Sequence, residues 1–99
     1  MSTEEDFRKF HNLTRKWKEE TFLKSSIDEI ESSVHYLQII KMGKRVLPFI
    51  FQELRSEPNL WFSALKKITG QNPIEESHRG VVKLMLKDWL KWGEEHGYK

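Results

Sequence analysis

The strongly apolar stretch of residues 42–70 contains two glycines and two prolines (MGKRVLPFIFQELRSEPNLWFSALKKITG). A proline inside a helix costs about 3 kcal/mol, whereas one in the first turn forfeits at most one hydrogen bond. If a helix begins at Lys44 or the next residue, Pro48 closes its first turn, and Pro58 takes the first position of the following helix. Gly70 then ends that second helix. Because the connection is only about three residues, the two helices are expected to be antiparallel neighbours.

The rest of the chain also repeats its apolar residues every three or four positions, which is typical of α-helices. Helices are expected from about Glu4 to Phe22, Val34 to Met42 and Arg79 to His96, with a short helical turn after the serines at 25 and 26. Few residues favour strands. The predicted fold is all-α: a single domain over residues 1–99, built as a compact bundle of about five helices that includes the antiparallel hairpin.

One face of the last predicted helix is expected to face the core. Its apolar line contains a glycine, which costs about 1 kcal/mol against alanine in a helix. Gly93 is therefore expected to permit the close approach of another helix. Leu84 lies among charged residues, away from this line, and packing explains it least. The line consists of Val82, Met85, Leu86, Trp89 and Gly93.

The composition excludes several kinds of chemistry. The chain has no cysteine, which removes disulfides, thiolate catalysis and cysteine-ligated metal. The histidines share no zinc-binding spacing, and the chain contains no nucleophile elbow or glycine-rich phosphate loop. We therefore predict no enzyme, no catalytic residue, no cofactor and no metal ligand. The four histidines are His11, His35, His78 and His96.

One expected loop gathers several titratable side chains. Glu75 and Glu76 precede His78 and Arg79, and an acid–base pair there is one interpretation. Acidic and capping residues also precede helices for structural reasons, and we favour this structural interpretation over the acid–base pair.

The N-terminus lacks the basic start and apolar run of a signal peptide. No stretch approaches the roughly 20 apolar residues that a membrane span needs. We expect a complete, cytoplasmic chain with no membrane contact.

The charge is spread unevenly along the chain. Residues 41–91 carry ten Lys or Arg and five Asp or Glu, a net of +5, against +2 for the whole chain. Nucleic-acid binding through this basic face is the alternative function, with Lys83, Lys87 and Lys91 facing the ligand. The preceding loop is too long for the usual helix–turn–helix connection, and a solvated helix face explains the same row of lysines.

Protein binding is the leading prediction. Tryptophan is favoured at binding hot spots, and four exceed the needs of a small core, although Trp17, Trp61 and Trp89 lie on predicted core faces. We expect a non-enzymatic interaction domain with an adaptor-, antitoxin- or immunity-like role, acting as a monomer or small homo-oligomer on an unidentified protein partner. The residues expected to contact that partner are Phe49, Phe62, Leu84 and Trp92.

Two resemblances add to this interpretation. The spacing of glycine, Pro48 and apolar residues over the hairpin resembles a HEAT-like helical pair. Most of the chain is similar to a family of small uncharacterised bacterial proteins, which implies a bacterial domain and carries over no activity. The motifs are WKEET (17–21), YLQIIKMG (36–43), WFSALKKITGQNP (61–73) and WLKWGEEHGY (89–98).

Overall fold

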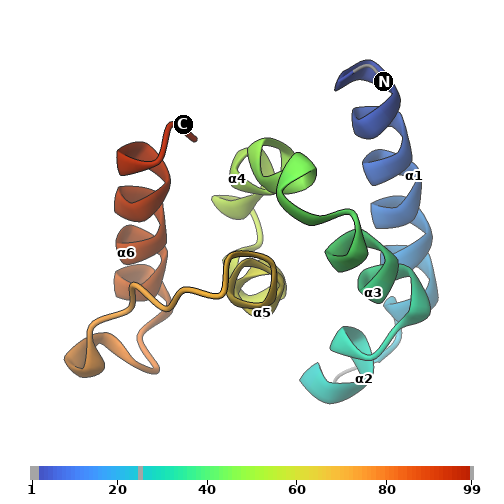
Figure 1. The fold of residues 1–99 in the computed structure, drawn as a ribbon. Helices are drawn as coiled ribbons and strands as arrows, with labels where there is room; N and C mark the ends of the chain where they lie inside the picture. Colours follow the sequence, from blue (N-terminus) through green and yellow to red (C-terminus); the bar gives the residue numbers. More distant parts are fainter. Residues whose placement is uncertain (1–2, 25, 99) are drawn as a thin grey trace. The chain divides into compact units, whose positions relative to one another are not determined.

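The structure is a computed structural model that describes residues 3–24 and 26–98 (Figure 1). Within these ranges there are six α-helices, two 3-10 turns and no β-strand, so the predicted all-α class is confirmed. The chain divides into a first unit, residues 1–46, and a second unit, residues 47–99. Each unit is described by itself, and the expectation of a single domain over residues 1–99 stays a prediction.

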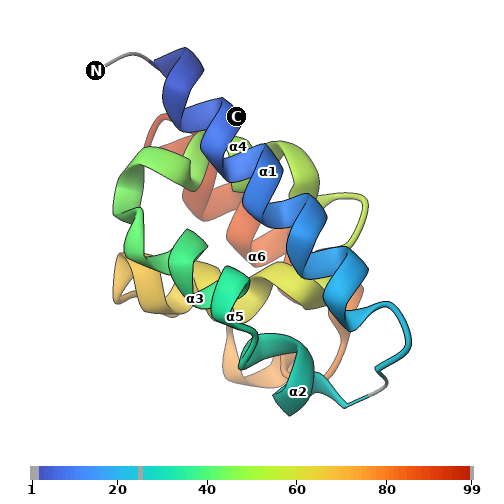
Figure 2. The same ribbon diagram turned by 90° about the vertical axis from the view of Figure 1, so that its right-hand side faces the viewer.

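The first unit is a helical hairpin with a short helix at its turn. Figure 2 shows α3 running back along α1, and these two helices pack against each other. The short turn expected after the serines at 25 and 26 is α2, and position 25 lies outside the described residues. The elements are α1 (Thr3–Thr21), α2 (Ile27–Glu31), α3 (Val34–Lys41) and the 3-10 turn η1 (Gly43–Val46).

The buried face of α1 follows the helical period. Successive members are three or four positions apart, so they lie on one side of the helix. Trp17 on this line is fully buried, and its indole packs in a tilted arrangement against the ring of Tyr36 on α3, with ring centroids 4.7 Å apart. The buried residues of α1 are Phe10, Leu13, Thr14, Trp17 and Thr21.

The second unit contains three helices, each of which packs against the other two. The chain reverses after α4, so α5 runs back beside it (Figure 2), while α6 crosses α5 (Figure 1). Pro58 occupies the first turn of α5 and Gly70 ends it with a φ of 70°, as predicted. The elements are α4 (Leu47–Leu54), α5 (Pro58–Thr69), the 3-10 turn η2 (Glu76–His78) and α6 (Val82–Glu95).

Two helix starts differ from the prediction. The expected start at Lys44 is a 3-10 turn, and the α-helix begins at Leu47, so Pro48 still falls in a first turn where its missing N–H costs little. The last helix begins at Val82 and not at Arg79. Arg79 is extended, with ψ of 134°, and Gly80 has φ of 84°, neither of which is helical.

Gly93 brings α6 close to α4. A Cβ built on Gly93 would lie 2.7 Å from a ring atom of Phe51, well inside ordinary contact distance. Both residues are buried. The prediction that Gly93 permits the close approach of another helix is therefore confirmed.

Candidate functional site

The four residues expected to contact a partner differ in exposure. Phe49 is only 7% exposed, so its predicted place on the surface is wrong. The physical reason is that α4 is apolar around most of its circumference, with five of its eight residues buried. Phe62, Leu84 and Trp92 are partly exposed. Their contact with a partner stays a prediction.

Leu84 lines a groove of about 880 Å³ along α6. The other apolar lining residues are Leu90 on the same helix and Tyr98 just beyond its end. This position accounts for the leucine that core packing left unexplained, since it faces a hollow in the second unit and not the apolar line of α6. Phe62, on α5, and Trp92 are not among the residues that line the groove, although Trp92 borders a smaller hollow next to Pro73.

Charged side chains of both signs also line the groove. Arg55, Lys87 and Lys91 contribute positive charge, so two of the three lysines expected in the basic row of the last helix lie here. Four carboxylates lie in the same groove and offset that charge. They are Glu75, Asp88, Glu94 and Glu95.

One wall of the groove is a histidine held between two carboxylates. His78 Nδ1 lies 2.7 Å from Asp88 Oδ2, and His78 Nε2 lies 3.3 Å from Glu75 Oε2. The backbone N–H of Glu75 also donates to Asp88 Oδ2, at 3.1 Å. These contacts fasten the 3-10 turn η2 to the middle of α6, so the loop forms a fixed edge of the groove.

The pKa of Asp88 reflects this arrangement. Burial acts to raise the pKa, but the hydrogen bonds from His78 and from the Glu75 N–H outweigh it, and the pKa lies below its ordinary value of 3.8. Asp88 therefore carries its negative charge at neutral pH.

The same three residues are a potential metal-ligand set. One ligand atom from each of Glu75, His78 and Asp88 lies within 4.8 Å of the others. Both ring nitrogens of His78 already face a carboxylate, so polar contacts that hold the loop against α6 are the simpler role. The earlier expectation that the residues before the last helix act as its cap is replaced, because residues 76–78 form their own turn and α6 starts later. Sequence reasoning missed Asp88, since no short motif links it to His78.

Trp92 lies in an aromatic cluster at the C-terminal end of α6. Its ring stacks on His96 with centroids 3.9 Å apart and on Phe51 at 6.2 Å. Tyr98 stacks on Phe51 at 5.6 Å, and its N–H donates to the carbonyl of Gly93. Much of the Trp92 side chain therefore packs against other residues of the second unit.

The first unit has the most exposed large apolar side chains. Phe22 is 81% exposed and Leu23 is 89% exposed, directly after the end of α1. They were not among the predicted partner-binding residues. The available signal was their position, since two large apolar residues follow the last buried residue of α1, Thr21, at a point where the amphipathic period stops.

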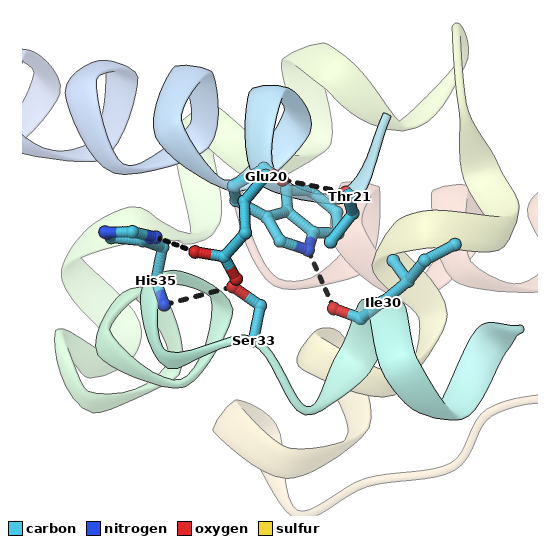
Figure 3. A network of polar contacts seen from close by, with 6 residues as sticks. Glu20, Thr21, Ile30, Ser33 and His35 are labelled. Carbon is cyan, nitrogen blue, oxygen red and sulfur yellow. Dashed lines mark hydrogen bonds and ion pairs between the residues drawn. The ribbon is translucent and has the colours of Figure 1, made fainter. Parts of the chain in front are cut away.

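A polar network joins the three helices of the first unit (Figure 3). Trp17 Nε1 donates to the carbonyl of Ile30 at 2.8 Å. Glu20 Oε2 lies 2.9 Å from His35 Nδ1, and the Ser33 hydroxyl accepts from the N–H of His35. The hydrogen bond with Ser33, together with the contact to His35, holds the pKa of Glu20 below its usual range, although burial acts to raise it.

No family model, curated protein or solved structure matches the chain. Within residues 3–24 and 26–98, no helix is both long enough and apolar enough to cross a membrane. The functional argument therefore depends on the chain's own geometry, of which the groove along α6 is the largest concave feature described above.

Proposed function

We propose that the chain is a non-enzymatic protein–protein interaction domain whose partner binds along α6. The observation that carries the proposal is Leu84, an apolar side chain that packing does not require and that lines a groove beside Leu90 and Tyr98. Protein interfaces usually combine apolar side chains with polar and charged ones, and both kinds line this groove.

The charges favour a protein partner over nucleic acid. A nucleic-acid site needs an unbroken positive surface, because affinity comes mainly from neutralising phosphates. Here Lys87 and Lys91 share the groove with Glu75, Asp88, Glu94 and Glu95. A protein segment with charges of both signs can complement this pattern, whereas a polyanion meets four carboxylates.

The remaining attributes are part of the same proposal. The role is adaptor-, antitoxin- or immunity-like, in the cytoplasm of a bacterium, with the chain acting as a monomer or small homo-oligomer. The α4–α5 pair serves as a HEAT-like frame against which α6 is held, and Phe62 and Trp92 contribute further partner contacts. The close approach of Gly93 to Phe51 supports a rigid frame of this kind.

Affinity capture with matched baits tests the proposal. The wild type, Leu84→Lys and Val81→Lys would each be immobilised and exposed to a lysate of the native host. Val81 is a suitable control because it is apolar and 47% exposed next to α6, yet it is not among the residues that line the groove. We expect one protein to be recovered by the wild type and by Val81→Lys, and lost with Leu84→Lys. Equal recovery by all three baits would contradict the groove, and recovery of nucleic acid alone would contradict the function.

The nucleic-acid alternative has its own measurement. If the basic face of residues 41–91 binds DNA or RNA, retardation on a gel should appear at low salt and weaken steeply as salt rises. We expect no retardation at 50 mM salt. Light scattering would separately decide between a monomer and a homo-oligomer.

A further inference from the structure

The first unit contains a small hollow lined mainly by positive side chains. It has a volume of about 210 Å³ and is formed where α1, α3 and η1 meet. None of its five lining residues is acidic. They are Lys9, Gln38, Lys41, Met42 and Arg45.

Arg45 is oriented toward this junction by two contacts within the unit. Its Nε donates to the carbonyl of Met42 at 3.1 Å, and its Nη1 lies 3.3 Å from Asp6 Oδ1. A guanidinium held in this way is pre-organised, so less side-chain entropy is lost when it contacts a ligand.

Local structure explains only part of this collection of charges. A cation is favoured at the C-terminus of a helix, which accounts for Lys41 at the last residue of α3. Lys9 comes from α1, where the helix dipole requires no cation, and Gln38 adds an amide. Three solvent-exposed positive side chains line one hollow, and Asp6 pairs with one of them. An anion in the hollow would be attracted by these cations and accept hydrogen bonds from them and from the amide.

We propose that this hollow binds a small tetrahedral oxyanion with the chemistry of phosphate. Guanidinium and ammonium groups donate strong, charge-assisted hydrogen bonds to phosphate oxygens, and the neutral amide can donate a weaker one. The hollow is open to solvent, and its volume of about 210 Å³ lies below the roughly 300–1,000 Å³ typical of drug-sized ligands, so a small ligand is the one proposed. The site is separate from the groove along α6 and does not depend on the proposed function.

A titration followed by amide NMR tests the site, with inorganic phosphate as the probe. Sodium chloride would hold the ionic strength constant, so that general screening does not change. We expect saturable shifts at the amides of Lys41, Met42 and Arg45, and no saturable shifts in a parallel titration with nitrate. Shifts that rise linearly without saturation, or that nitrate reproduces, would overturn the proposal.

Charge-removing variants localise the effect. Lys9→Gln and Lys41→Gln keep most of the side-chain length, and each should weaken phosphate binding by roughly fivefold or more. Lys16→Gln is the matched control, since Lys16 is an exposed lysine on α1 that does not line the hollow. Circular dichroism would establish that all three variants are folded. Equal weakening by Lys16→Gln, or no weakening by the other two, would overturn the assignment of the site.

Discussion

The two units of the chain use buried tryptophans in different ways. In the first unit, the indole N–H of Trp17 donates to the carbonyl of Ile30, and so connects α1 to α2. In the second unit, Trp89 is equally buried, but its indole N–H has no hydrogen-bond partner among the described residues. Trp89 instead contributes ring packing, including an edge contact with Trp92.

This difference shows what each unit needs from its largest side chains. The five-residue helix α2 is far too short to be stable alone, so a directional bond from Trp17 holds it in place. Each of the three helices of the second unit is at least eight residues long, and this unit depends on close packing, as at Gly93 and Phe51. The first unit should therefore be sensitive to lost hydrogen bonds, and the second to added volume.

Adding volume at Gly93 should have the largest effect. Alanine gains about 1 kcal/mol of helix propensity over glycine, but its Cβ would meet the Phe51 ring at 2.7 Å. Overpacking of this kind costs about 1–3 kcal/mol. Because Phe51 is buried and stacked on Tyr98, it cannot move aside freely, so the overpacking cost should lie at the upper end of this range. After the gain in helix propensity is subtracted, we expect Gly93→Ala to lose about 2 kcal/mol of unfolding free energy in urea denaturation.

A second variant isolates the contact at Gly93. Phe51→Leu removes the ring that the new methyl group meets, so Gly93→Ala should cost less in that background than in the wild type. An unchanged or greater cost would contradict close packing as the reason for glycine at this position.

Removing the indole N–H should lower stability by different amounts in the two units. Trp17→Phe and Trp89→Phe both lose one ring of a buried tryptophan, and that cost is shared. Trp17→Phe also leaves the carbonyl of Ile30 without its donor, so its loss of stability should be greater by about 1 kcal/mol. The comparison requires urea denaturation of both variants, and equal losses would mean that the hydrogen bond does not distinguish the units.

Asp88 should make the second unit sensitive to acid. Its pKa is lowered on folding, so the unfolded chain binds the proton more tightly and stability rises with pH through this window. The contribution is fully present above the ordinary value of 3.8 and is lost as the pH falls through the folded value. Asp88→Asn should cost about 1 kcal/mol at pH 7.

The pH dependence distinguishes this contact from simple packing. The difference between wild type and Asp88→Asn should shrink as the pH falls below the ordinary pKa of 3.8, because the carboxyl takes up a proton first in the unfolded chain and, at lower pH, in the folded protein. A difference that stays constant from pH 7 to pH 3 would contradict the ion pair with His78.

Glu20 should show the smallest effect. Its lowered pKa follows the same sign as that of Asp88, but its side chain is more exposed to solvent, which screens the interaction. Glu20→Gln should lower the urea midpoint slightly at pH 7 and leave it unchanged under acid. A larger loss than that of Asp88→Asn would reverse the order expected for the two units.

Local rules predicted most of the fold. Pro58 and Gly70 bracket α5 because proline tolerates a first turn and glycine adopts a left-handed end, and both effects depend on neighbouring residues alone. The role of Gly93 could be predicted for a similar reason. Its place on the apolar line of α6 indicated a close helix contact, although the sequence did not identify the contacting residue.

Tertiary contacts account for what the sequence did not predict. Phe49 falls beside polar residues in the sequence, but α4 is buried around most of its circumference. The pairing of His78 with Asp88 joins a loop to a position ten residues later, and no local period indicates it. Leu84 was singled out only as a residue that packing left unexplained, and the groove that surrounds it required the folded chain.

The most direct test of the interaction domain is the affinity of its captured partner for purified variants. With that partner immobilised, wild type, Leu84→Lys and Val81→Lys would be compared by biolayer interferometry at one salt concentration. Replacing Leu84 by lysine removes the apolar contact of the leucine with the partner and places a charge where it would lose its hydration. We therefore expect Leu84→Lys to bind at least about tenfold more weakly. Val81→Lys should bind within about twofold of wild type. Equal affinity of Leu84→Lys and wild type would contradict binding along α6.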